Sequence, residues 1–151
     1  MEGCIFCKIA SEEFQSAKIW EDENHVAFLD INPNMIGMTL VIPKKHFDSY
    51  TFKMPDEDHH ALIDAAKKTS EILEKALNVK RVAMVMEGLG VNHAHIKLYP
   101  INGLDEKFKD IWSKKRVFFE MFEGYITTEL GPQRSMEELQ ALAEEIKKRA
   151  K

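Results

Sequence analysis

The stretch VNHAHIKLYP, Val91 to Pro100, spaces two histidines and a lysine at every second residue, as His93, His95 and Lys97. Side chains alternate across a strand, so this spacing predicts that the three nitrogen-bearing groups share one face. A neutral imidazole can attack phosphorus, and an ammonium group stabilises negative charge that accumulates there. The pattern is compatible with a phosphate site, but the two histidines taken alone favour the polar face of an ordinary strand.

A second group of candidate residues begins with Cys4 and Cys7, which have the Cys-x-x-Cys spacing of one arm of a zinc site. A closed zinc site has four ligands, so two more must come from elsewhere. His46, which follows the apolar run LVIPKK, is the obvious third candidate. The alternative is a pair of small buried thiols without a metal.

The composition restricts the class of protein. A chain of 151 residues suits one domain with a real hydrophobic core. A formal net charge of -4 argues against a partner that is a nucleic-acid polymer or an anionic membrane. No apolar run reaches the roughly 20 residues that span a bilayer, and the first residues do not resemble a signal peptide. A cytoplasmic protein with reduced or metal-bound cysteines is expected.

The elements that must position these residues follow from periodicity. The segment AKIWEDENHVAFLDINP predicts two strands around the turn EDEN. Its expected inward positions are Ile19, Val26, Phe28 and Ile31. MTLVIP and RVAMVME predict two further apolar strands. Short links between the strands favour antiparallel pairing and an α+β fold.

Two helices are expected. Pro55 and the three acids after it indicate a helix start, and Asn78 a stop. Ser135 and Glu138 fit a capping box at the start of a second helix. The apolar positions with helical spacing are Leu62, Ala66, Thr69, Leu73 and Leu77 in the first helix, and Leu139, Leu142, Ala143 and Ile146 in the second.

Four motifs occur in a fixed order over roughly the first two-thirds of the chain: CIFCKI, AFLDINP, LVIPKKHF and VNHAHIKLYP. Together they resemble the histidine triad (HIT) family of nucleotide-binding hydrolases and transferases. The resemblance implies a HIT-like α+β fold, with an antiparallel sheet of about five strands, one long helix and a C-terminal helix. It implies a single domain over 1–151, with a motif-bearing core at 1–102 and an extension at 103–151 that carries a helix at about 135–149.

The resemblance also implies a mechanism. His95 matches the family nucleophile and His93 the first triad histidine. His95 would attack the α-phosphorus of a nucleoside phosphate derivative, either a nucleoside phosphoramidate or a dinucleoside polyphosphate, and form a nucleotidyl-histidine. That chemistry needs a neutral imidazole whose other nitrogen is held by an acceptor. The alternatives are a nucleotidyltransferase and a catalytically weak, zinc-stabilised nucleotide-binding or regulatory module.

The sequence departs from the family pattern in two places. Lys97 stands at the third histidine position, where its charge can serve, but a lysine with an unperturbed pKa of about 10.4 is a poor proton shuttle near neutrality. The loop before the triad is the short EGLGVN, in which Gly88 and Gly90 leave backbone N–H groups open to a phosphate. The family's hydroxyl donor is missing, and Asn92 should face away from His93.

The nucleoside pocket is predicted by resemblance. Asp30 matches the acid that binds the ribose hydroxyls, and its alternative role is to cap its own backbone in a turn. The residues that match the apolar wall around the base are Ile5, Phe6, Ile9, Phe28, Leu29 and Ile31, and their alternative role is plain core.

By resemblance the zinc ligands are Cys4, Cys7, His46 and His93, and the ion would help to orient His95. Without zinc, His46 and His93 would form a hydrogen-bond relay. An AMP- or GMP-like substrate and a homodimer are expected by analogy. After the triad, the aromatic-rich region Trp112 to Phe122 is a candidate for core or for an apolar patch that meets a second subunit. The basic run Lys114 to Arg116 is a candidate contact for an anionic substrate, with a solvated loop as its alternative. The hydroxyls of Thr127 and Thr128 are candidate replacements for the missing donor.

Overall fold

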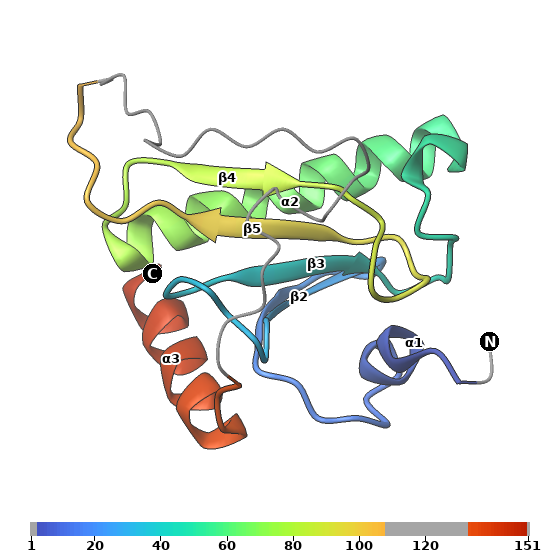
Figure 1. Ribbon diagram of the computed structural model, residues 1–151, viewed down its shortest axis with the longest axis horizontal. Coiled ribbons are helices and arrows are strands. Elements are labelled where there is room, and N and C mark those ends of the chain that lie inside the picture. Colours follow the sequence, from blue (N-terminus) through green and yellow to red (C-terminus); the bar gives the residue numbers. More distant parts are fainter. Residues whose placement is uncertain (1–2, 108–132, 151) are drawn as a thin grey trace, which may run out of the picture.

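The computed structural model describes residues 3–107 and 133–150 and has an antiparallel five-stranded sheet in the order β1-β2-β3-β5-β4 (Figure 1). The strands are β1 Lys18–Glu21, β2 His25–Leu29, β3 Thr39–Pro43, β4 Val82–Val85 and β5 Ile96–Pro100. The expected α+β class, the antiparallel pairing and the five strands are confirmed. β2 and β3 are buried along their whole length, whereas β4 is a partly exposed edge strand.

The long helix α2 spans Asp56–Leu77 and fulfils the expectation from the sequence. Three acids occupy its first turn, where they interact favourably with the positive end of the helix dipole. It ends at Asn78, which adopts the left-handed conformation at φ 52°. The buried side of α2 includes Leu62, Ala66, Thr69 and Leu73, so the predicted stripe is the packing face.

Alternation along the strands sorts side chains into two apolar clusters. On one face of the sheet, Ala27, Val41, Ile96 and Leu98 pack with α2 and α3. On the other, Val26, Phe28, Leu40 and Ile42 pack with a short helix near the N-terminus. Ala94 belongs to the first cluster together with Ile96 and Leu98, so every second residue from Ala94 to Leu98 faces this core.

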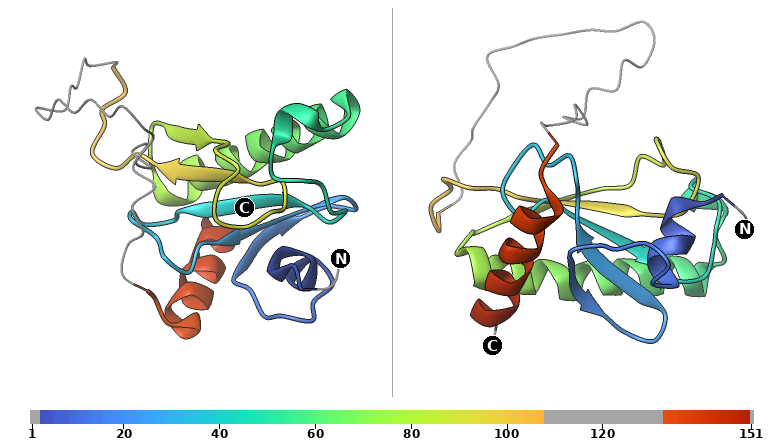
Figure 2. Two further views of the ribbon diagram at one scale, coloured as in Figure 1. Left: turned by 45° about the vertical axis from the view of Figure 1, so that its right-hand side comes forward. Right: turned by 90° about the horizontal axis from the view of Figure 1, so that it is seen from below.

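α3, Met136–Arg149, closes the first cluster and matches the helix expected at about 135–149. Ser135 and Glu138 form the complete capping box that their spacing predicts. Both views in Figure 2 place α3 beside the C-terminal end of α2. There Lys75 Nζ donates to the Ala150 carbonyl at 2.6 Å, which joins the two helix ends.

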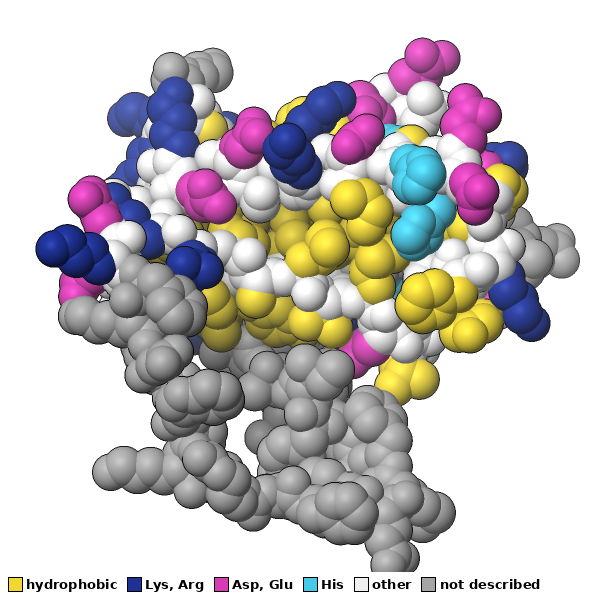
Figure 3. All heavy atoms as spheres, turned by 90° about the horizontal axis from the view of Figure 1, so that it is seen from above, with side chains coloured by type: hydrophobic (Ala, Val, Ile, Leu, Met, Phe, Trp, Pro, Cys, Tyr) yellow, Lys and Arg dark blue, Asp and Glu magenta, His cyan; other side chains and the backbone are white. Residues whose placement is uncertain are grey.

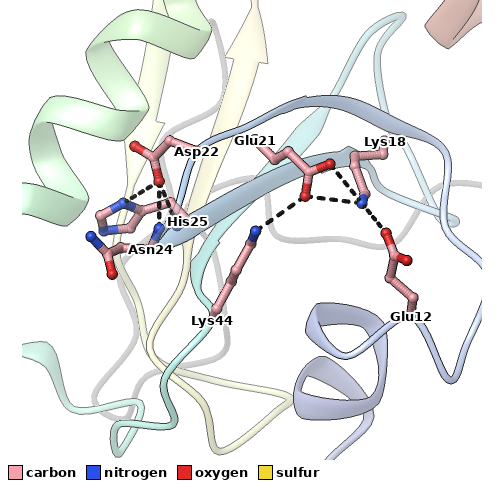
Figure 4. A network of polar contacts seen from close by, with 7 residues as sticks. All are labelled: Glu12, Lys18, Glu21, Asp22, Asn24, His25 and Lys44. Atoms are coloured by element: carbon pink, nitrogen blue, oxygen red, sulfur yellow. Dashed lines mark hydrogen bonds and ion pairs between the residues drawn. The ribbon is translucent and has the colours of Figure 1, made fainter.

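The short helix α1, Ile5–Ala10, is absent from the sequence expectations. Six residues are too few for a helical pattern to stand out from composition alone. The chain that follows α1 is tied to the sheet by an ion-pair network (Figure 4): Lys18 bridges Glu12 and Glu21, and Lys44 reaches Glu21 at 3.2 Å. α1 is thereby linked to the segment that follows β3.

One of the expected inward positions is wrong. Ile31 is not inward: the chain leaves β2 after Leu29, and 44% of Ile31 is exposed. His25 directly follows the turn EDEN. It begins β2, is buried, and lies 3.2 Å from Asp22 through its Nδ1 atom (Figure 4).

The candidates between Trp112 and Thr128 lie outside the described residues. No helix in the described part of the chain is long and apolar enough to span a membrane.

Candidate functional site

Four ligand atoms from three separate segments converge at one point. The Sγ atoms of Cys4 and Cys7 and ring nitrogens of His46 and His93 all lie within 4.8 Å of one another. Cys4 is the N-cap of α1 and Cys7 lies in its first turn, so a spacing of three residues turns both thiols to the same side. His46 follows β3, and the Ala94 N–H donates to the Phe47 carbonyl at 2.9 Å, which brings His46 beside His93.

The distances fit a tetrahedral ion. Zinc with bonds of about 2.3 Å to sulfur and about 2.05 Å to nitrogen holds its S and N ligands about 3.6 Å apart and two N ligands about 3.3 Å apart. Nδ1 of His93 lies 3.5 Å from each sulfur and 3.3 Å from His46 Nδ1. Cys7 Sγ lies 3.3 Å from His46 Nδ1. The donor set and spacing therefore match a closed Cys2His2 zinc centre.

Hydrogen bonding fixes the ring of His93 for this role. Its Nε2–H donates to the Pro43 carbonyl at 2.8 Å, so the lone pair of Nδ1 points toward the two thiols and His46. Burial, aided by His46 and His95, lowers the pKa of His93 to about 4, which keeps the ring neutral near pH 7. Burial and the neighbouring Cys4 raise the pKa of the Cys7 thiol, which a bound cation would reverse.

In His95 the roles of the two ring nitrogens are the reverse of those in His93. Its Nδ1–H donates to the carbonyl of His93 at 2.7 Å, which leaves the lone pair on Nε2. Burial and the charge of Lys97 lower the pKa of His95, although the bond to His93 opposes them. The ring is therefore neutral near pH 7, with one nitrogen held by an acceptor, as nucleophilic attack requires. His93 and His95 precede β5, which begins at Ile96, so they lie in an irregular approach to the strand.

Lys97 is on β5, two residues beyond His95, and forms an ion pair with Glu87. The pair is shielded from water: 13% of the Lys97 side chain and 5% of the Glu87 side chain are exposed. Glu87 belongs to none of the four sequence motifs. The pairing of β4 with β5 brings it to the site, because Val85 pairs with Lys97 and Glu87 follows two residues later.

Only some of the residues predicted to form the apolar wall around the base pack together. Phe6 contacts Phe28, His93 and His95 edge-on, with ring centroids 5.5 to 5.9 Å apart. Ile9 belongs to the same cluster. Ile5 and Ile31 are exposed at 42% and 44%, as a surface open to a ligand would be.

Leu29 is the exception among the wall candidates. Its side chain lies in the opposite cluster, and it lines a pocket of about 290 Å³ together with Met38 and Leu139. Leu29 follows Phe28 in a strand, so alternation turns it to the α3 side of the sheet.

Asp30 is buried directly after β2, and its Oδ1 accepts the backbone N–H of Asn32 at 2.8 Å. One carboxylate oxygen of Asp30 therefore has the turn-capping role that was the alternative to ribose binding. The carboxylate also acts electrostatically on the face that carries the histidines. Burial, Glu87 and Asp30 together raise the pKa of Tyr99 to about 12.

The loop before the histidines is fastened to the segment after β3. Gly88 has φ +69°, and an added Cβ would lie 2.6 Å from the Ser49 carbonyl oxygen, so close packing already explains the glycine. Gly90, at φ +85°, has nothing within 4 Å of a Cβ position. Asn92 accepts the Ser49 N–H at 2.9 Å and so faces away from His93, as expected.

Comparisons with known proteins agree with this architecture. The HIT domain model matches residues 11–100. An uncharacterized HIT-like protein of Methanocaldococcus jannaschii is 42% identical over 101 residues, which are 64% of this chain and 78% of the relative. The adenosine 5'-monophosphoramidase of Saccharomyces cerevisiae is 35% identical over 99 residues, covering 65% of this chain and 62% of the relative. The crystal structure of a hypothetical histidine triad nucleotide-binding protein from Sulfolobus tokodaii superposes with a TM-score of 0.71 at 27% identity, covering 97% of this chain and 91% of the other.

Proposed function

Because the chain belongs to the HIT domain family, whose model spans residues 11–100, we propose that it is a nucleotide-binding phosphohydrolase that uses His95 as its nucleophile. The observation that carries the proposal is the hydrogen bond from His95 Nδ1 to the carbonyl of His93, which presents Nε2 as an unprotonated nitrogen. The similarity to the yeast monophosphoramidase supports chemistry at an α-phosphate.

Nε2 of His95 attacks the α-phosphorus of a nucleoside phosphate derivative, and the bond from phosphorus to the leaving group breaks with its electron pair. Water then attacks the nucleotidyl-histidine and releases the nucleoside monophosphate, while the electron pair of the P–N bond returns to Nε2 and a proton passes to solvent. The Lys97 ammonium stabilises negative charge on the phosphoryl oxygens and the leaving group.

The proposal is tested by intact-mass spectrometry after rapid mixing with adenosine 5'-phosphoramidate or diadenosine triphosphate. We expect an adenylyl adduct whose tryptic peptide contains His95. If neither nucleotide produces an adduct or releases AMP, the enzymatic proposal is wrong.

Asp30 is proposed to accept the ribose hydroxyls through the carboxylate oxygen that does not cap Asn32. We expect Asp30→Asn to weaken AMP binding about 10- to 100-fold, since a hydrogen bond to a charged group contributes about 1.5–3 kcal/mol. The amide oxygen of asparagine can still accept the Asn32 N–H, so the turn is preserved. Calorimetric titration with AMP measures the loss.

Titration with 2',3'-dideoxy-AMP provides the control, because that ligand has no hydroxyls to donate. Its affinity should be nearly equal for the wild type and Asp30→Asn. An equal loss for both ligands would mean that Asp30 acts only through the turn.

We propose that zinc occupies the Cys4, Cys7, His46 and His93 site, because the four ligand atoms lie within 4.8 Å of one another and His93 Nδ1 lies 3.3 to 3.5 Å from the other three. When bound, the ion supplies four ligand bonds that join α1 to the segments before β5 and after β3. His93 is then held at both ring nitrogens, and its carbonyl is the acceptor for His95. Thiolate ligands suit the reducing cytoplasm, which is the location we propose.

A homodimer is proposed through the exposed edge strand β4 and the neighbouring α2. Figure 3 looks onto this side and shows apolar side chains gathered there, and 49% of Met84 on β4 is exposed. Unpaired edges and exposed apolar surface both favour association. The proposed single domain over 1–151 would contribute one such surface per chain.

We expect sedimentation velocity to give twice the chain mass of 17.4 kDa and Met84→Lys to give the monomer, because a buried, unpaired ammonium is costly. Ile36→Lys is the matched control, since Ile36 is 63% exposed in the link between β2 and β3. A monomeric wild type at micromolar concentration would contradict the dimer.

A further inference from the structure

The buried pair of Lys97 and Glu87 lies beside the proposed nucleophile. Glu87 follows β4 and Lys97 is on β5, where Val85 pairs with Lys97, so the strand register brings the two side chains together. One oxygen of Glu87 contacts Lys97 Nζ, and the other is buried without a hydrogen-bond partner among the described residues. Lys97 therefore provides the hydrogen-bond donor and the positive charge that this buried carboxylate faces.

This buried ion pair makes Lys97 a poor proton donor to a leaving group. If the ammonium passed a proton to a leaving group, the buried carboxylate would lose its counter-charge in a region of low dielectric constant, which is strongly unfavourable. Tyr99 does not replace it as a donor. Its hydroxyl is buried without a hydrogen-bond partner in the described part of the chain, and burial and Glu87 raise its pKa to about 12. The face next to His95 thus carries a fixed cation and a weak acid.

Leaving groups differ in whether they need a proton. When a phosphoanhydride is cleaved, the bridging oxygen takes the electron pair of the P–O bond and departs as a phosphate anion, which a fixed cation stabilises. When a phosphoramidate is cleaved, the nitrogen takes the electron pair of the P–N bond and must also receive a proton to leave as an amine.

We propose that the Lys97–Glu87 pair makes this site selective for nucleoside phosphoanhydrides, whose leaving group is a phosphate or polyphosphate, over nucleoside phosphoramidates. This inference rests on the proposed nucleotidyl transfer to His95 and specifies its substrate class. Lys97 meets the leaving oxygen, and Glu87 is a positioning residue that holds the ammonium in place and charged. In the second step the attacking water molecule releases one proton to solvent, so neither step takes a proton from Lys97.

The test compares kcat/KM for diadenosine triphosphate with kcat/KM for adenosine 5'-phosphoramidate. In the wild type we expect the anhydride to be favoured at least tenfold. Lys97→His introduces a group that can donate a proton near neutrality, so the ratio should shift toward the phosphoramidate by at least tenfold. Lys97→Arg keeps a fixed cation and should preserve the preference for the anhydride. Lys67→His, at an exposed position on α2, is the control and should leave the ratio unchanged.

Glu87 is tested by its effect on turnover. Glu87→Gln should lower kcat for diadenosine triphosphate at least tenfold with little change in KM, and should change phosphoramidate cleavage less. A series of adenosine 5'-aryl phosphates adds a readout that a purely structural role would not alter. In the wild type, kcat/KM should rise steeply with the acidity of the leaving phenol, and the slope should become shallower in Lys97→His.

The two proposals fail differently. A wild type that forms the His95 adduct but cleaves the phosphoramidate as well as the anhydride overturns the leaving-group inference alone. An unchanged ratio in Lys97→His does the same. The absence of any adduct and of any turnover with both substrates overturns the proposed function, and the inference with it.

Discussion

His95→Ala is expected to lower kcat/KM for any nucleotide that forms the adduct by at least about 10³-fold, since removing one member of a serine protease triad costs about 10⁴- to 10⁶-fold. The hydrogen bond from His95 Nδ1 to the His93 carbonyl places the reactive lone pair on Nε2, and alanine removes it. The variant should still bind AMP, because Asp30 and Phe6 are unchanged. Initial rates of AMP release and calorimetric titration measure the two effects separately.

The control for this experiment is His60→Ala, which removes an exposed histidine from α2. Its rate should equal that of the wild type. Because His95 is almost fully buried beside Phe6, the melting temperature of His95→Ala must also be recorded. A folded His95→Ala protein that retains more than a tenth of the wild-type rate would rule out His95 as the nucleophile.

The second large effect concerns the proposed zinc ion. We expect a chelator to lower the melting temperature by about 10 °C or more, because structural zinc sites contribute several kcal/mol and each kcal/mol corresponds to about 2–4 °C in a chain of this size. The site joins α1 to residues that follow β3 and precede β5, so its loss releases three segments at once. Calorimetric melting with and without chelator gives the shift, and elemental analysis should find one zinc ion per chain.

Two variants separate metal binding from general damage. Cys4→Ser combined with Cys7→Ser should contain no zinc, and its lower melting temperature should not respond to the chelator. His59→Ala removes a histidine of α2 that is not a ligand and should keep the zinc and the response. A wild type that contains no zinc after zinc-supplemented expression and shows no response to the chelator would contradict the site.

Features that depend on local geometry can be predicted from the order of the residues alone. The alternation from His93 to Leu98 predicts which side chains point to the core, because successive residues of an extended chain face opposite sides. The helix α2 and the capping box of α3 follow from spacing within single turns. His95 and the four zinc candidates were identified because ordered motifs resemble a known family.

Which distant groups meet depends on how the segments pack in three dimensions. α1 has too little periodicity to be predicted, yet it turns Cys4 and Cys7 toward His46 and His93. Ile31 was misplaced because pairing with β3 decides where β2 ends, whereas alternation along the strand already separates Leu29 from Phe28. Glu87 became visible as the partner of Lys97 only through the register of β4 and β5. Periodicity is fixed by bonded geometry within a few residues, whereas the partner of a buried charge depends on how remote segments pack.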